Sequence, residues 1–76
     1  MKFEEALRRV IEEHGRATKG IPAFNSVHEG FAVILEEVDE LKAEVWKKPR
    51  LRDKAQMRKE AVQVAAMAMR FLIELL

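Results

Sequence analysis

The sequence predicts an all-α protein with one shorter N-terminal helix and two long antiparallel helices, in a single domain spanning residues 1–76. Three observations support this class. Apolar residues recur at the period of an α-helix, capping residues precede both long periodic runs, and no segment shows the strict alternation of a strand. The chain is short and has no cysteine, so neither a disulfide nor a thiolate-bound metal can stabilise it. Oligomerisation is the remaining route to a stable fold.

The N-terminal helix is predicted from apolar residues at helical spacing with charged residues between them: Phe3, Ala6, Leu7, Val10 and Ile11. Gly15 is predicted to end this helix. His14, at the end of the apolar stripe, is expected to cap the helix C-terminus rather than to act as a ligand. Residues 15–25 contain two glycines and a proline without helical periodicity, so we expect a loop there.

Capping residues mark the starts of the two long helices. Ser26 followed by Glu29 is the pattern of a capping box, which predicts a second helix from about residue 26 to Trp46 or Lys48, before Pro49. Asp53 is predicted to cap a third helix that continues towards the C-terminus. Because a short loop joins the second and third helices, we expect them to pack antiparallel.

The third helix is unusually apolar. From Ala61 to Ile73 nearly every residue is apolar, and these side chains point almost all the way round the helix. A helix that is apolar on all sides is buried on all sides, yet three helices in a small chain cannot enclose one of their own. The sequence therefore predicts a homo-oligomeric helical bundle, a dimer or tetramer, in which residues 61–73 also pack against a partner subunit.

The segment ILEEVDELKAEV, residues 34–45, concentrates acidic side chains on the second helix. Glu37, Glu40 and Glu44 form a stripe that borders the apolar face, while Glu36 lies farther out. Either a solvated face with salt bridges or a metal site is consistent with this stripe. Bases three or four residues away are mostly missing, and each like-charge pair such as Glu36–Glu40 costs about 0.2–0.5 kcal/mol. The stripe therefore needs a positive charge from elsewhere.

The third helix offers a facing group of ligands. Glu60 and Gln63 are three residues apart and share one face of that helix. If the long helices pack antiparallel, Glu37 and Glu40 can face them, which gathers three carboxylates and an amide oxygen. Oxygen ligands of this kind suit Mg²⁺, or Mn²⁺, rather than zinc or copper.

Two motifs resemble those of a known family. EEVDE at 36–40 is similar to the Glu-Glu-x-x-Glu signature of the MazG-like all-α nucleoside triphosphate pyrophosphohydrolases, and EAVQ at 60–63 falls where that family has Glu-x-x-Asp. The surrounding segments, about two-thirds of the chain, resemble the small MazG-like proteins in particular. The resemblance implies that Glu37, Glu40 and Glu60 bind Mg²⁺ and that Glu36 completes the motif. Gln63 departs from the pattern, and the site thereby loses one negative charge.

The resemblance also implies a reaction: hydrolysis of a nucleoside or deoxynucleoside triphosphate between the α- and β-phosphates, which gives a monophosphate and pyrophosphate. Glu36 or Glu37 is the expected catalytic carboxylate that accepts the proton of the attacking water. Phosphate contacts are expected from the following basic residues: Lys47 and Arg58 in the basic segment 47–59, or Arg70 on the Glu60 stripe.

Two alternatives remain open. The basic segment 47–59 can equally be a solvated loop that balances the acidic helix. The chain can also be a catalytically weakened or inactive MazG-like oligomer that serves as a binding or regulatory module.

Bulk composition sets the remaining expectations. A net charge of +1, and a basic segment without interleaved aromatic residues, disfavour nucleic acid as a partner. The apolar run VAAMAM is far too short to span a membrane. The first ten residues carry acids and lack the apolar region of a secretion signal. The absence of cysteine fits a reducing compartment, so a cytoplasmic location is expected.

Overall fold

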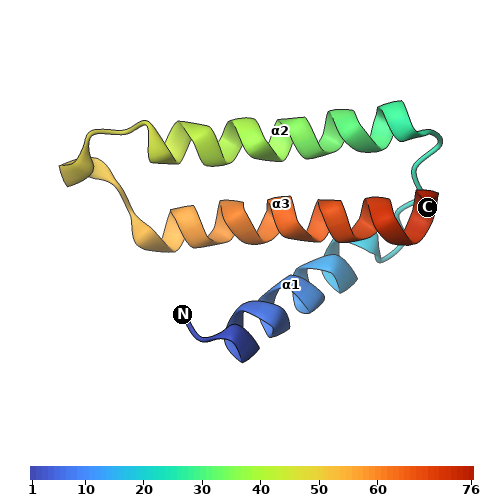
Figure 1. Cartoon of the computed structure of the whole chain (residues 1–76), viewed down its shortest axis with the longest axis horizontal. Coiled ribbons are helices and arrows are strands. Elements are labelled where there is room, and N and C mark those ends of the chain that lie inside the picture. Colours follow the sequence, from blue (N-terminus) through green and yellow to red (C-terminus); the bar gives the residue numbers. More distant parts are fainter.

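The computed structural model describes residues 1–76 and contains three α-helices and no strand (Figure 1). Their bounds are Phe3–Thr18 for α1, Val27–Val45 for α2 and Lys54–Leu75 for α3. A short 3-10 turn, Pro49–Leu51, lies between α2 and α3. The predicted all-α class and the predicted order, one shorter helix followed by two long antiparallel helices, are confirmed.

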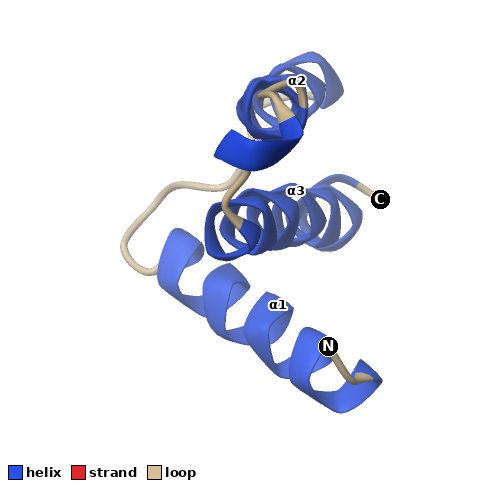
Figure 2. Ribbon diagram, turned by 90° about the vertical axis from the view of Figure 1, so that its left-hand side faces the viewer, coloured by secondary structure: helices blue, strands red, loops and turns tan.

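α3 is the central helix of the chain. It packs against α2 on one side and against α1 on another, and both views show it between the other two helices (Figure 2). α1 and α2 thus cover two sides of α3, and among its apolar residues only Ala66 and Met67 are buried. None of the three helices combines the length and apolar character that crossing a membrane requires.

The end predicted for α1 at Gly15 is wrong, because the helix continues to Thr18. Thr18 Oγ1 donates to the carbonyl oxygen of His14 at 2.8 Å, which helps to hold the last turn together. The chain leaves the helix at Lys19, and Gly20 follows with a φ of 70°, in the left-handed region that glycine tolerates.

His14 consequently does not cap the C-terminus of α1. It lies inside the helix, and its Nε2 atom is buried without a hydrogen-bond partner. The sequence pattern misplaced it because an isolated glycine weakens a helix without necessarily ending it.

The caps predicted for the two long helices are present. Ser26 Oγ accepts a hydrogen bond from the backbone N–H of Glu29 at 3.1 Å. The Glu29 carboxylate accepts from the backbone N–H of Asn25 at 2.9 Å, one residue before the position that a standard capping box uses. The Asp53 carboxylate accepts from the N–H of Ala55 at 2.8 Å. These caps fix where α2 and α3 begin.

The buried core is small and lies towards the C-terminal end of α3. Its buried apolar residues are Phe24, Ala66 and Met67. Gly30 of α2 is also buried. A Cβ atom there would lie 2.8 Å from side-chain atoms of Phe71 and of Leu75. The lack of a side chain at Gly30 thus lets α2 approach α3 closely.

Arg70 ties the loop before α2 to α3. Its side chain is buried, and it donates to Glu74 at 2.7 Å and to the carbonyl oxygen of Pro22 at 2.8 Å. The guanidinium carbon lies 3.9 Å from the centroid of the Phe24 ring, so the cation stacks on the aromatic face. Arg70 is therefore part of the packing at this end of the molecule.

Candidate metal centre

Three carboxylates from two helices meet along the contact between α2 and α3. Glu37 and Glu40 project from α2 and Glu60 projects from α3, and one carboxylate oxygen of each lies within 4.8 Å of the others. Glu37 and Glu60 are partly buried, whereas Glu40 is exposed. The antiparallel packing of the two helices thus brings together the three acids that the sequence placed on facing stripes.

Gln63, the fourth predicted ligand, also joins this carboxylate cluster. In the amide orientation that satisfies its surroundings, the side-chain nitrogen donates to Glu37 Oε2 at 3.2 Å and to Glu60 Oε2 at 2.9 Å. Gln63 therefore links one carboxylate of each helix. To offer its oxygen to a cation, the amide would have to turn over.

Burial, together with the crowding of like charge, raises the pKa of two members of the cluster. Burial raises the pKa of Glu37, and the negative charge of Glu40 raises it further. The pKa of Glu60 is also raised, first by burial and then by Glu40. A cation bound among these oxygens would favour the ionised forms, so the cluster is electrostatically suited to one.

Three acids of the same stretch, Glu36, Asp39 and Glu44, lie outside the cluster. Glu44 forms an ion pair with Lys47, with 2.7 Å between Lys47 Nζ and a Glu44 carboxylate oxygen. Glu36 is exposed on α2 and is not among the three clustered carboxylates. Of the two predicted catalytic residues, the structure thus brings Glu37 into the cluster and leaves Glu36 beside it.

The three predicted phosphate-binding residues are not brought together. Lys47 is paired with Glu44, and Arg58 lines an apolar hollow between α1 and α3 with neighbours such as Val10. Arg70 lies ten residues after Glu60, about 15 Å along the helix, and its guanidinium makes the packing contacts described above. Substrate binding by these residues stays a prediction.

Two charged residues near the cluster were not singled out from the sequence. Glu13 of α1 contributes to the raised pKa of Glu37, and Lys59 of α3 lowers the pKa of Glu60, against the larger effects that raise it. The position of Lys59, immediately before Glu60, was an available signal. Glu13 could not have been found, because no local pattern shows which side of α3 receives α1.

Comparisons of the chain with protein-family models, with curated proteins and with solved structures gave no match. The geometry and the chemistry of the carboxylate cluster are therefore the indications of function that the molecule offers.

Proposed function

We propose that this protein is a MazG-like pyrophosphohydrolase that uses Mg²⁺ to hydrolyse a nucleoside or deoxynucleoside triphosphate to the monophosphate and pyrophosphate. The observation that carries the proposal is the meeting of Glu37, Glu40 and Glu60 at one point between α2 and α3. A solvated acidic face would keep like charges apart, yet here they converge from two helices.

The donor set supports the choice of metal. Three carboxylates and an amide that can turn its oxygen inward are hard oxygen donors, which Mg²⁺ prefers and Mn²⁺ also accepts. When bound, such an ion would neutralise phosphate charge and lower the pKa of a coordinated water.

Glu37 is the best placed of the candidate bases. It lies within the cluster, where a water coordinated to the metal would be in reach of its carboxylate, whereas Glu36 is exposed beside the cluster. Glu37 has two carboxylate oxygens, so one can take the proton of the water while the other holds the metal together with Glu40 and Glu60. Glu36 remains the second candidate for the catalytic base, and its side chain is exposed on α2.

Metal binding provides the first test. Calorimetric titration with Mg²⁺ and Mn²⁺ is expected to show binding to the wild type and at least about tenfold weaker binding to Glu37→Ala and Glu60→Ala, because even outer-shell changes cost 10–100-fold. Glu12→Ala, an exposed acid on α1 outside the cluster, is the control. Equal titrations for all four proteins would show that the cluster holds no metal.

One observation favours the alternative of a catalytically weakened or inactive module. Gln63 supplies N–H groups to Glu37 and Glu60, so it offsets part of their negative charge without any metal. Gln63→Glu should tighten Mg²⁺ binding at least about fivefold, since a unit charge about 4 Å away contributes about 1 kcal/mol even in water. Ala23→Glu adds the same charge in the exposed loop before α2, far from the cluster, and should not.

Pyrophosphate release separates the two functions. A panel of nucleoside and deoxynucleoside triphosphates with Mg²⁺ or Mn²⁺ should yield pyrophosphate with the wild type and not with Glu60→Ala. If the Gln63→Glu variant released pyrophosphate and the wild type did not, the wild type would be the catalytically weakened module.

Since nucleoside triphosphates are abundant in the cytoplasm, we place the reaction there.

We also infer that the chain acts as a homo-oligomer, a dimer or tetramer, assembled through residues 61–73. On α3, the side opposite Gln63 is exposed and consists of small or apolar residues at helical spacing: Ala61, Ala65, Ala68 and Leu72. The flanking helices expose further large apolar side chains: Phe31, Leu35 and Val38 of α2, and Phe3, Leu7 and Ile11 of α1.

The accessible area supports this assembly. The chain exposes 5661 Å², whereas a folded monomer of its mass is expected to expose about 4,800 Å². The excess of about 900 Å² is close to the share of about 800 Å² that each partner buries in a standard interface.

A further inference from the structure

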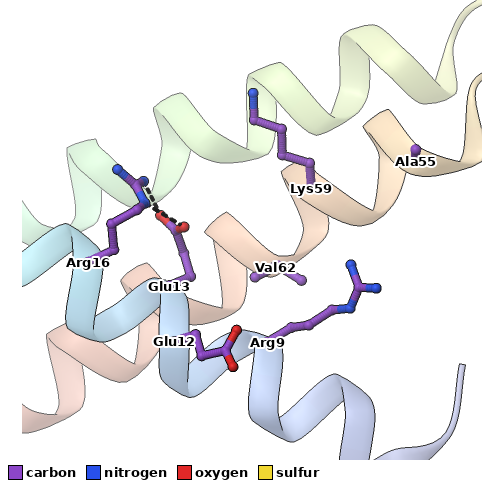
Figure 3. Close-up of a pocket in the computed structure, with 7 residues that line it drawn as sticks. All are labelled: Arg9, Glu12, Glu13, Arg16, Ala55, Lys59 and Val62. Carbon is purple, nitrogen blue, oxygen red and sulfur yellow. Dashed lines mark hydrogen bonds and ion pairs between the residues drawn. The ribbon is translucent and has the colours of Figure 1, made fainter.

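A hollow lies between α1 and the N-terminal half of α3 (Figure 3). Its volume is about 310 Å³, near the lower end of the range for small-ligand pockets. Five charged side chains line it, four from α1 and one from α3: Arg9, Glu12, Glu13, Arg16 and Lys59. With three positive and two negative charges, the lining is positive on balance.

Lys59 and Glu13 connect this basic hollow to the carboxylate cluster. Lys59 directly precedes Glu60 and is one helical turn before Gln63, so its side chain neighbours that of Gln63 on the surface of α3. Figure 3 shows both Lys59 and Glu13 extending from their helices in the direction of α2. The charge of Glu13 also contributes to the raised pKa of Glu37. The basic hollow and the cluster therefore lie on neighbouring faces of α3.

Two of the positive groups have unused donors. Lys59 takes part in none of the ion pairs of the structure. Arg9 donates through Nη2 to Glu5 at 2.9 Å, while its Nε atom is buried and has no hydrogen-bond partner. A buried donor without an acceptor is unfavourable. An oxyanion in the hollow would supply acceptors to Lys59 and to the N–H groups of Arg9 that Glu5 does not use.

Arg16 is the third positive group of the hollow. It is bound to Glu13 by two hydrogen bonds, from Nε at 2.9 Å and from Nη2. The Arg16 side chain is 68% exposed, whereas that of Glu13 is 16% exposed, so the guanidinium is accessible to a ligand that competes with Glu13 for it. Its guanidinium also matches the geometry of a phosphate group, which it can bind through two parallel hydrogen bonds.

We propose that the basic hollow binds the β- and γ-phosphates of the nucleoside triphosphate, the part released as pyrophosphate, through Lys59, Arg9 and Arg16. This inference rests on the proposed function, in which the cluster acts on the neighbouring α-phosphate. It assigns substrate binding to α1, which takes no part in the predicted metal site. The basic residues that it assigns to phosphate binding also differ from those expected from the sequence.

The test is calorimetric titration with pyrophosphate at a Mg²⁺ concentration that saturates the cluster. Lys59→Gln should bind Mg²⁺-pyrophosphate about tenfold more weakly than the wild type, because it loses a charge-assisted hydrogen bond. The control is Lys19→Gln, an exposed lysine just beyond α1, which should bind as the wild type does. In the absence of pyrophosphate, Mg²⁺ should bind Lys59→Gln at least as tightly as it binds the wild type, because the variant lacks a positive charge beside Glu60.

Glu13→Gln gives a readout of opposite sign. The substitution frees Arg16 and removes a negative charge from the hollow, so Mg²⁺-pyrophosphate should bind several-fold more tightly. A merely structural role for these residues would not produce a loss in one variant and a gain in the other. Circular dichroism should show unchanged helix content in both, since Lys59 is exposed and Gln is a good helix former.

The outcomes distinguish the inference from the function on which it rests. Mg²⁺ binding with equal pyrophosphate affinity in the wild type, Lys59→Gln and Glu13→Gln would overturn the inference and leave the proposed function standing. A wild type that binds no Mg²⁺ would overturn the proposed function, and the substrate assigned to the hollow with it.

Discussion

The Glu37 carboxyl group is ionised at a cost, because burial and the neighbouring Glu40 both disfavour its charged form. Its pKa in the folded protein therefore lies above the ordinary value of 4.5, and the folded state binds a proton more tightly than the unfolded chain does. Below pH 4.5 Glu37 carries no such penalty. As the pH rises through the raised pKa, the penalty grows and stability falls.

Glu37→Gln is accordingly expected to raise the melting temperature at pH 7 in the absence of metal. The gain over the wild type should shrink as the pH falls and vanish below 4.5, where the carboxyl group becomes protonated in both the folded and the unfolded state. Mg²⁺ should then stabilise the wild type much more than the variant, since the variant has lost a ligand. Thermal unfolding followed by circular dichroism across this pH range measures both effects.

The control for this prediction is Glu36→Gln, the exposed neighbour outside the cluster. It removes the same charge from the same helix and should leave the response to Mg²⁺ unchanged. If Glu36→Gln and Glu37→Gln showed the same dependence on pH and on Mg²⁺, the cluster would have no special electrostatic role.

At the scale of the helix, α1 and α2 each contain one glycine, in different surroundings. A Cβ atom added at Gly15 would meet nothing within 4 Å, whereas one added at Gly30 would lie 2.8 Å from Phe71 and from Leu75. Glycine weakens a helix for entropic reasons at both positions. Only Gly30 has a packing reason to be there, because it lets α2 approach the end of α3.

Alanine at these two positions should therefore change stability in opposite directions. Gly15→Ala is expected to stabilise the protein by about 0.5–1 kcal/mol, the ordinary gain in helix propensity. Gly30→Ala is expected to destabilise it, because overpacking costs about 1–3 kcal/mol and outweighs that gain. Urea unfolding of the two variants beside the wild type measures the difference. Stabilisation by both substitutions would mean that the contact at Gly30 relaxes freely.

The whole molecule has little buried core for the apolar surface that it carries. Its buried apolar residues are Phe24, Ala66 and Met67, while large side chains such as Phe3 and Leu72 are 75% and 62% exposed. A small domain of this kind gains much of its stability from association. This imbalance, rather than any single contact, is the reason to expect a partner subunit.

Ala65→Glu is expected to shift the protein towards the monomer, with association at least about tenfold weaker, because a charge would be buried without a partner. Ala43→Glu, on the exposed outer side of α2, is the matched control and should not change the assembly. Sedimentation equilibrium should give a multiple of 8.8 kDa for the wild type and for the control. A wild type that sediments as a monomer at all concentrations would remove the basis for the assembly.

Local signals in the sequence predicted much of the fold and the membership of the cluster. Ser26 and Asp53 marked the starts of α2 and α3, because a capping side chain needs only its own first turn. The spacing of Glu37, Glu40, Glu60 and Gln63 placed them on facing stripes, and the two helices do bring them together. The end of α1 was misjudged because the interactions around Thr18, not Gly15 alone, decide it.

By itself, the sequence determined three helices, the caps of the long two, and which acids face each other across them. Only the tertiary structure decided that α1 covers α3 beside that cluster, that Gln63 donates to two of its carboxylates, and that Arg70 is held in packing contacts. The physical reason is the distance along the chain over which each signal acts. Periodicity and capping act within a few residues. The effect of the Glu13 charge on the pKa of Glu37 depends instead on how α1 docks against α3, which is far along the chain.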